Sequence, residues 1–398
     1  MRNKTLLLFT DSYPYGKGEQ YLDNEISYYC KSFNKIFFIP INRKGKIRDI
    51  PNNAKILDIH KLTSFSNINK ITILPLFIIH FINEVLFTRN ILIFSKLFQY
   101  YTSYYNAFAY KKSIIKWIKN GKIDPSNIVF YSYWMYHWAF VISQLKNYFK
   151  TPLTISRAHL YDTYHYLNFL PWAAYKLKKI DKIICISHHA NKYLSKNHTK
   201  ASDKIITSYL GVKHIGINPM NKLKKKIFVS CSSIREDKRL DYIIDVLSNL
   251  KQDIKWIHFG DGNDSNKIMK YAKKLPNNIE VCFMGHTANN KVLEYYKNEH
   301  IDLFINLSLR EGIPVSIMEA ISFGIPVMGT NVFGTPEIVN NKTGILININ
   351  NTSKEVAIQI DRFLKSDDID RQRILDFYNE NFNADKVYND FSKILTLQ

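Results

Sequence analysis

The sequence predicts an α/β protein built from two successive doubly wound domains. Short apolar runs alternate with amphipathic helical stretches, which is the pattern of a parallel sheet covered by helices. The alternation breaks once, in the polar, lysine-rich stretch Lys213–Lys226, and then begins again. A chain of 398 residues is also too long for one typical domain. We therefore expect domains over 1–213 and 214–376, followed by a helix over 377–398.

The expected strands are short, apolar and followed by polar or glycine-containing sequence. Such runs suit parallel strands that helices cover on both faces. The N-terminal series is Thr5–Phe9, Lys35–Ile39, Ile128–Tyr131, Leu153–Ser156 and Lys182–Ile186. The C-terminal series is Lys226–Ser230, Ile254–Phe259, Glu280–Met284, Asp302–Ile305, Pro326–Gly329 and Gly344–Ile347.

Apolar residues at helical spacing predict the helices between these strands. Met318–Phe323 predicts a helix that stops at Gly324-Ile325-Pro326, a glycine followed by a proline. One helix face in the C-terminal domain is marked by Leu240, Ile243, Ile244, Leu247 and Leu250.

The composition is strongly basic. Lys and Arg number 55 against 34 Asp and Glu, so the formal net charge is +21. An excess of this size indicates an anionic partner, which could be a nucleic acid, a membrane surface or a phosphorylated substrate. The four cysteines stand far apart with no C-x-x-C pair, so we expect neither a zinc site nor disulfides, and a cytoplasmic location.

The most apolar stretch runs from Ile71 to Phe98. Pro75, Glu84 and Arg89 interrupt it, so it contains no charge-free span long enough to cross a membrane. Two alternatives remain from the sequence: a buried helix pair, or a surface that dips into a membrane interface.

In the C-terminal domain, the candidate functional groups are two carboxylates and the backbone at the start of a helix. Glu311 precedes an expected helix and Glu319 lies two turns along it, ~12 Å away at 1.5 Å per residue. One carboxylate can therefore reach a sugar while the other reaches a ribose, since both oxygens accept hydrogen bonds from vicinal hydroxyls. The backbone at the helix start is a site for a diphosphate, formed by Gly312, Ile313, Pro314 and Val315.

The stretch E-G-I-P-V-S-I-M-E-A-I-S-F-G-I-P-V from Glu311 resembles the E-x7-E signature of family 4 glycosyltransferases. Four further segments resemble the family's motifs in the same order: Val229–Ser233 with Lys238, Phe259–Gly262, Phe283–Gly285 and Gly334–Val339. The resemblance implies the GT-B fold, in which two Rossmann-like domains face each other across a cleft. The C-terminal domain then binds a nucleotide-sugar donor, the N-terminal domain binds the acceptor, and the last helix crosses back to the N-terminal domain.

The resemblance also implies roles for donor-site residues. Glu311 is the expected catalytic carboxylate and Glu319 the ribose ligand, while Lys238 contacts the diphosphate and Gly260 belongs to the donor site. The family's usual arginine position holds Ser233 here, so we expect Arg235, two residues further on, to compensate.

In the N-terminal domain, two loops after expected strands carry the candidates. Gly18 and Glu19 end a glycine-rich loop like the family's first loop, where Glu19 either binds acceptor or is only a charge at a helix start. His159 matches the histidine that meets the donor sugar in the family, and it is expected to be catalytic. Arg157 and Asp162 beside it are expected to bind acceptor.

The function that the resemblance implies is a retaining transfer of a hexose-type sugar. The donor is expected to be a UDP- or GDP-sugar. The acceptor is expected to be a growing, lipid-linked bacterial surface polysaccharide: lipopolysaccharide, capsule or exopolysaccharide. No residue spacing suggests a metal site, so we expect no metal and no cofactor. The protein would be cytoplasmic and peripheral to the inner face of the plasma membrane, without a nucleic-acid partner.

The alternatives are a sugar-nucleotide epimerase on the same scaffold and a basic nucleic-acid-binding protein, although no motif of the latter kind is present.

Overall fold

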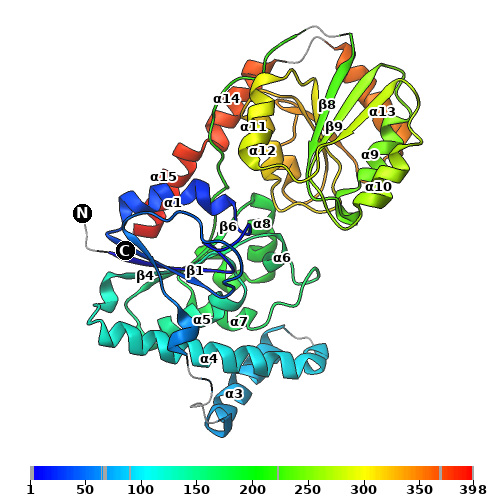
Figure 1. Cartoon of the computed structure of the whole chain (residues 1–398). Coiled ribbons are helices and arrows are strands. Elements are labelled where there is room, and N and C mark those ends of the chain that lie inside the picture. The colour runs from blue at the N-terminus through cyan, green and yellow to red at the C-terminus, as the bar shows by residue number, and fades with distance from the viewer. Residues whose placement is uncertain are drawn as a thin grey trace. The chain divides into compact units, whose positions relative to one another are not determined.

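The computed structural model of the chain describes residues 4–63, 65, 70–88, 91–221, 224–366 and 370–396. The chain forms two compact units (Figure 1). Unit 1 comprises Met1–Ser208 and Tyr388–Gln398, and unit 2 comprises Tyr209–Val387. Each unit is a parallel sheet covered by helices, as the sequence predicts.

Unit 1 contains a seven-stranded parallel sheet in the order β3-β2-β1-β4-β5-β6-β7. Its strands are β1 (Thr5–Thr10), β2 (Lys35–Pro40), β3 (Ala54–Ile56), β4 (Ile128–Ser132), β5 (Leu153–Ala158), β6 (Lys182–Cys185) and β7 (Ile205–Thr207). Every residue of the central strand β1 is buried, because helices cover both faces of the sheet. These helices are α1 (Tyr21–Ser32), α2 (Ile59–Leu62), α3 (Lys70–Thr88), α4 (Leu97–Asn120), α5 (His137–Phe149), α6 (Leu160–Thr163), α7 (Ala173–Lys179) and α8 (His188–Asn197).

Unit 2 contains a six-stranded parallel sheet in the order β10-β9-β8-β11-β12-β13. Its strands are β8 (Lys226–Cys231), β9 (Ile254–Phe259), β10 (Ile279–Phe283), β11 (Leu303–Asn306), β12 (Val327–Thr330) and β13 (Gly344–Ile347). Its helices are α9 (Leu240–Leu247), α10 (Ser265–Ala272), α11 (Asn289–Asn298), α12 (Val315–Ile321), α13 (Ser353–Lys365) and α14 (Arg371–Asn381). The last helix, α15 (Ala384–Thr396), begins in unit 2, and its residues from Tyr388 onward belong to unit 1.

All the expected strands are confirmed, with ends that agree to within two residues. The sequence analysis missed β3 and β7, which lie at the two edges of the first sheet. Each is three residues long, which is too short for an apolar run or a period of two to stand out. The face marked by Leu240 is also confirmed, except that α9 ends at Leu247 and Leu250 is buried in the turn that follows.

The single helix expected at the C-terminal end is wrong, because α14 and α15 are separate helices. Between them, the backbone of Phe382 and Ala384 pairs with Val212 through two hydrogen bonds of 3.0 Å. The Asn383 side chain then accepts the N–H of Asp385 at 3.0 Å and so caps the start of α15, a position that favours asparagine. This pairing with a distant segment of the chain ends α14.

The apolar stretch 71–98 forms α3, the 3₁₀ turn Ile91–Lys96 and the start of α4. Burial of the whole stretch is wrong, because one side of α3 is exposed: Ile71, Ile79 and Leu86 retain 78%, 55% and 69% of their surface. Arg89, one of the expected interruptions, lies outside the described residues. Among the helices that the structure describes, none has the length and apolar character needed to cross a membrane.

Candidate functional site

The donor half of the expected site lies in unit 2, where the loops after several strands meet. The loop after β11 is tied to the 3₁₀ turn Glu236–Lys238 after β8, because Leu309 N–H donates to Asp237 O at 2.8 Å. The turn after β9 touches the loop after β8 as well, since Ile234 N–H donates to Asp261 O at 3.0 Å. Ligands of parallel α/β sheets bind at this carboxyl edge of the strands.

Lys238 and Glu311 form an ion pair at the centre of these loops. The distance from Lys238 Nζ to Glu311 Oε1 is 2.6 Å, and each side chain is 14% exposed. Asn306, the last residue of β11, donates to the same Glu311 oxygen at 3.3 Å. The structure therefore brings together the expected diphosphate ligand and the expected catalytic carboxylate. Charge-assisted contacts of this length are strong when partly shielded from water.

Glu319 lies on α12 and accepts a hydrogen bond from Asn289 Nδ2 at 2.8 Å. Burial raises the pKa of the Glu319 carboxyl to about 7, and the hydrogen bond from Asn289 opposes part of that rise. Cys231, at the end of β8, is close enough that burial and the Glu319 charge together raise the pKa of its thiol to about 12. Glu319 is therefore poised to change charge near neutral pH.

Gly260 and Gly262 allow the turn after β9 to lie against the loop after β8. Gly260 has a φ of 139°, and a Cβ there would stand 1.8 Å from Ser232 O. A Cβ on Gly262 would stand 2.2 Å from Ile234 O. Glycine is needed at both positions because backbone approaches backbone. The structure thus shows a packing role for Gly260, and its expected donor contact stays a prediction.

The remaining donor candidates lie beside the ion pair. Pro314 caps α12 and accepts the N–H groups of Ile317 and Met318 at 3.1 and 3.2 Å. The backbone of Gly312, Ile313, Pro314 and Val315 thereby forms the turn that joins Glu311 to α12. Arg235 is half exposed, and its Nη2 lies 3.3 Å from Asp237 Oδ2 in the same loop as Lys238.

In unit 1, Glu19 organises the first loop. Its carboxylate accepts the backbone N–H groups of Asp11, Ser12 and Tyr13 at 2.9, 2.8 and 2.6 Å, and the indole N–H of Trp134 at 2.7 Å. Gly18 beside it packs tightly, since a Cβ there would stand 2.5 Å from Ser12 Oγ. The carboxylate of Glu19 is thus occupied in holding the loop.

Arg157 is fully buried in unit 1. Its guanidinium pairs with Glu25 Oε1 at 2.6 Å and lies 4.2 Å from the ring centroid of Phe391. Neither side chain of the ion pair has any exposed surface. This placement does not support the expected contact with an acceptor, because an acceptor cannot reach a side chain without exposed atoms.

His159 follows β5 and has unused hydrogen-bonding capacity. Its ring is nine-tenths buried and lies 4.2 Å from the Trp134 ring, yet neither ring nitrogen has a hydrogen-bond partner in the described structure. Asp162 holds the surrounding backbone, because its carboxylate accepts the N–H groups of Met135, at 2.7 Å, and of His159. Buried polar atoms without partners are rare and indicate a place for water or a ligand.

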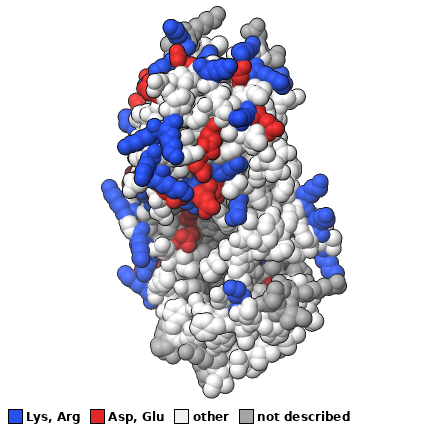
Figure 2. Space-filling view, turned by 90° about the vertical axis from the view of Figure 1, so that its right-hand side faces the viewer, with Lys and Arg blue, Asp and Glu red and all other residues white. Residues whose placement is uncertain are grey.

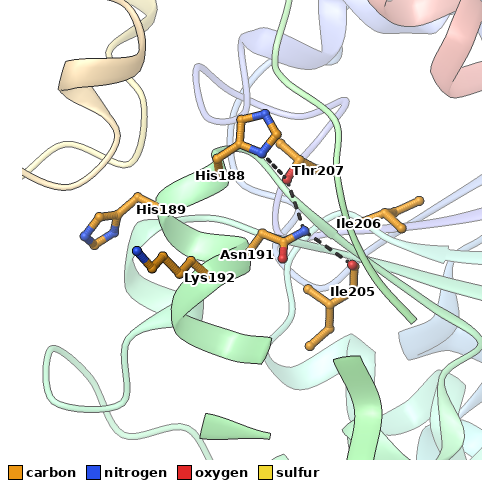
Figure 3. Close-up of a pocket in the computed structure, with 7 residues that line it drawn as sticks. All are labelled: His188, His189, Asn191, Lys192, Ile205, Ile206 and Thr207. Atoms are coloured by element: carbon orange, nitrogen blue, oxygen red, sulfur yellow. Dashed lines mark hydrogen bonds between the residues drawn. The ribbon is translucent and has the colours of Figure 1, made fainter. Parts of the chain in front are cut away.

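An open pocket lies at the same edge of the first sheet, between α8 and β7 (Figure 3). His188 Nδ1 and Asn191 Nδ2 are 3.2 and 3.1 Å from Thr207 Oγ1. Lys192 adds a cation to its lining. The sequence analysis assigned no role to these residues, although α8 and β7 place them near the carboxyl edge where ligands of such sheets bind.

Two donor-site side chains escaped the sequence analysis. Asn306 could have been found, since it directly follows an expected strand. Asn289 could not, because 30 residues separate it from Glu319 and no motif includes it. Among the described residues, no group of three or more His, Cys, Asp or Glu side chains has the arrangement of a metal site.

Comparison with known proteins agrees with this geometry. Residues 217–376 match the family model described as "Glycosyl transferases group 1". N-acetyl-alpha-D-glucosaminyl L-malate synthase of Bacillus anthracis is 29% identical over 189 residues, which cover 44% of this chain and 48% of that protein. Lipopolysaccharide 1,6-galactosyltransferase of Escherichia coli K12 is 27% identical over 110 residues, 28% of this chain and 31% of that protein. The chain spans about half the length, or less, of the curated relatives it matches first.

Several solved structures match nearly the whole chain, and two of them serve as examples. The lipopolysaccharide outer core galactosyltransferase WaaB, in its apo form, has a TM-score of 0.68 at 15% identity, covering 99% of this chain and all of that one. Anabaena HepE in complex with UDP and glucose has a TM-score of 0.66 at 12% identity, covering 98% and 99%. The chain therefore has the GT-B fold, and most of its second unit matches the group 1 glycosyl transferases.

Proposed function

We propose that this protein is a glycosyltransferase that moves a hexose-type sugar from a UDP- or GDP-sugar to an acceptor hydroxyl. The observation that carries the proposal is the Lys238–Glu311 pair at 2.6 Å, with Glu319 on the helix that follows. A cation and two carboxylates at one sheet edge match a donor made of a diphosphate, a sugar and a ribose. The galactosyltransferase relative and the UDP and glucose held by HepE support this donor class.

In the proposed reaction, the bond between the anomeric carbon and the diphosphate oxygen breaks. An acceptor hydroxyl forms the new bond on the same face of the sugar, so the anomeric configuration is retained, and its proton goes to the departing diphosphate. Lys238 neutralises charge on the diphosphate, with Arg235 and the backbone from Gly312 to Val315 nearby. Glu311 orients the sugar, Glu319 accepts hydrogen bonds from the ribose, and His159 supplies a catalytic imidazole. No metal or cofactor takes part.

For the acceptor, we propose a growing, lipid-linked bacterial surface polysaccharide such as lipopolysaccharide, capsule or exopolysaccharide. The lipopolysaccharide galactosyltransferases among the relatives support this class. An acceptor of this kind would place the enzyme in the cytoplasm, peripheral to the inner face of the plasma membrane. The net charge of +21 suits a negatively charged surface.

The test is transfer of radiolabelled sugar from UDP-glucose, UDP-galactose, UDP-N-acetylglucosamine or GDP-mannose to a bacterial lipid extract, with EDTA present. We expect one donor to label the organic phase, with loss of labelling in Glu311→Gln. Magnetic resonance of the product reports the anomeric configuration. Conversion of the donor sugar without acceptor would instead indicate an epimerase, and no reaction with any donor would reject the proposal.

A further inference from the structure

Helix α3 is apolar on two opposite faces. Its inner face holds Ile73, Phe77 and Phe81, each with at most 5% of its surface exposed. The Phe77 ring lies 5.8 and 6.0 Å from the rings of Tyr104 and Trp172, so this face packs on an aromatic cluster of unit 1. A helix that is apolar all round is expected inside a protein core or in contact with a membrane.

The outer face of α3 is exposed. Ile71, Ile78 and Ile82 are exposed by 78%, 45% and 51%, and the four-residue spacing of the last two places them on one side of the helix. Figure 1 shows α3 at the lower edge of unit 1, beyond α4, and Figure 2 shows that the described surface at this height is almost entirely uncharged. We call this the α3 surface: Ile71, Leu74, Ile78, Ile79, Ile82 and Leu86, extended by Phe94, Leu97 and Phe98. Contiguous exposed apolar surface marks an interaction site.

Helix α3 is firmly attached to unit 1 through a buried carboxylate. Glu84 is 1% exposed and accepts the N–H groups of Ala173 and Ala174, at 2.7 and 3.0 Å, at the start of α7. A negative charge at the start of a helix is stabilising. The outer face is therefore presented to solvent by a fixed helix.

The segment around the α3 surface is strongly cationic. Residues 64–123 contain eight Lys and Arg but a single acid, Glu84, whose carboxylate is buried. Lys96 is exposed between Phe94 and Leu97. A cation beside exposed apolar side chains can bind an anionic lipid headgroup while the apolar side chains contact the acyl chains. No exposed acid in this segment of the sequence would oppose that binding.

We propose that the α3 surface docks into the interface of an anionic lipid bilayer. Its apolar side chains enter the boundary between headgroups and acyl chains, while the exposed Lys96 contacts a headgroup phosphate. This inference deepens the lipid-linked acceptor of the proposed function and rests on it for its biological purpose. Binding to lipid does not depend on sugar transfer, so the two proposals can fail separately.

The test is flotation of the full chain with vesicles of phosphatidylcholine alone or mixed equally with phosphatidylglycerol. We expect binding to the mixed vesicles and much weaker binding to the neutral ones. Ile78→Gln with Ile82→Gln should weaken binding to mixed vesicles by about tenfold or more, because two apolar side chains no longer enter the interface. Both side chains are half exposed, so the melting temperature should stay close to that of the parent.

Matched variants in unit 2 are the controls. Met269→Gln with Ile358→Gln removes two exposed apolar side chains and should leave binding unchanged. Lys96→Gln should weaken binding to mixed vesicles by about fivefold, since a cation near such a surface contributes ~1 kcal/mol. Lys267→Gln makes the same change in net charge on α10 and should leave binding unchanged.

Three results would overturn the proposal. The first is a parent protein that floats with neither kind of vesicle, and the second is an Ile78/Ile82 variant that floats like the parent. The third is light scattering in which the parent is a dimer and that variant a monomer, because the α3 surface would then bind a second copy. Sugar transfer to a water-soluble acceptor, retained in a variant that no longer floats, would leave the proposed function intact.

Discussion

Lys238 and Glu311 neutralise one another in the donor half of the site. At 2.6 Å and 14% exposure, the pair is shielded enough to be strong but open enough for a ligand to reach. A bound diphosphate would give Lys238 a second anionic partner. Glu311 would then be free to accept hydrogen bonds from the sugar, which links donor entry to the orientation of the reacting carbon.

Glu311→Gln should lower kcat by at least about tenfold, or ~1.4 kcal/mol in the barrier, because the amide cannot balance Lys238 and the sugar together. Lys238→Gln should also raise KM for the donor, since the diphosphate loses a cation. Steady-state kinetics with the accepted nucleotide-sugar measure both. The control is Glu294→Gln, an exposed carboxylate paired with Lys291 on α11. A normal kcat in Glu311→Gln would remove this residue from the reaction.

Glu319 predicts a pH dependence of donor binding. Its pKa is raised by burial to about 7, so the carboxylate that would accept ribose hydrogen bonds exists mainly above that pH. Affinity for a UDP-sugar, whose phosphates do not titrate in this range, should therefore rise by about tenfold from pH 6 to pH 8. Calorimetry at several pH values measures it. Glu319→Gln should bind weakly with no such slope, and a slope retained in that variant would assign the titration to another group.

His159 has two buried ring nitrogens without hydrogen-bond partners, although Nδ1 lies 3.9 Å from Asp162 Oδ2, so a ligand that reaches the ring gains hydrogen bonds without breaking any. His159→Ala should lower turnover by at least about tenfold while the chain stays folded, as circular dichroism would show. The matched control is His165→Ala, because His165 lies at the surface and bonds Tyr193 at 2.6 Å. Equal turnover in both variants would show that His159 only packs against Trp134.

Among the elements of unit 1, the Glu25–Arg157 pair joins α1 to β5 and to the end of α15. Glu25 also accepts hydrogen bonds from Tyr29 and from Tyr133, the latter at 3.2 Å, and the guanidinium lies over the Phe391 ring. A buried pair contributes little net stability while intact, but one partner alone is a desolvated charge. The cluster therefore makes the packing of α15 on unit 1 depend on both residues.

Glu25→Gln should destabilise the fold by about 3–5 kcal/mol, because the charge of Arg157 stays buried without its counter-ion. Urea unfolding followed by circular dichroism measures this loss. Glu25→Gln with Arg157→Met should be less destabilised than Glu25→Gln alone, since no charge is then stranded. A double variant that is less stable than either single variant would mean that packing, rather than charge, determines the stability of the cluster.

Much of the element order could be predicted because parallel strands covered on both faces are continuous apolar runs. The short edge strands β3 and β7 have no such run. Glu311 was predicted from its place between an expected strand and an expected helix, and Lys238 was predicted by resemblance to the family's phosphate-binding loop. The burial of Arg157 could not be foreseen, because its partner Glu25 is 132 residues away and no local pattern links the two. The exposure of α3 was one of two alternatives that the sequence left open, since an apolar helix predicts burial equally well.

For the whole molecule, the net charge of +21 must be reconciled with a sugar-nucleotide site that uses few cations. Figure 2 shows that most Lys and Arg of the face displayed lie in its upper and middle parts, where Asp and Glu are interspersed among them. A nucleic-acid-binding protein would gather them into a stripe along its ligand. If the α3 surface docks on an anionic bilayer as proposed, part of the excess would serve that contact.

The effect of each nucleotide-sugar on the melting temperature of the whole chain would identify the donor class. A ligand that binds only the folded protein stabilises it by ~2.7 kcal/mol at a hundred times its Kd, so the melting temperature should rise by several degrees. We expect this rise with one class of nucleotide-sugar, either UDP or GDP, and an equal rise with magnesium or with EDTA. Lys238→Gln should reduce it and Lys267→Gln should not, because only the first residue faces the proposed diphosphate. A rise that needs magnesium would contradict metal independence. No rise with any donor, together with stabilisation by duplex DNA that falls steeply with salt, would favour nucleic-acid binding over sugar transfer.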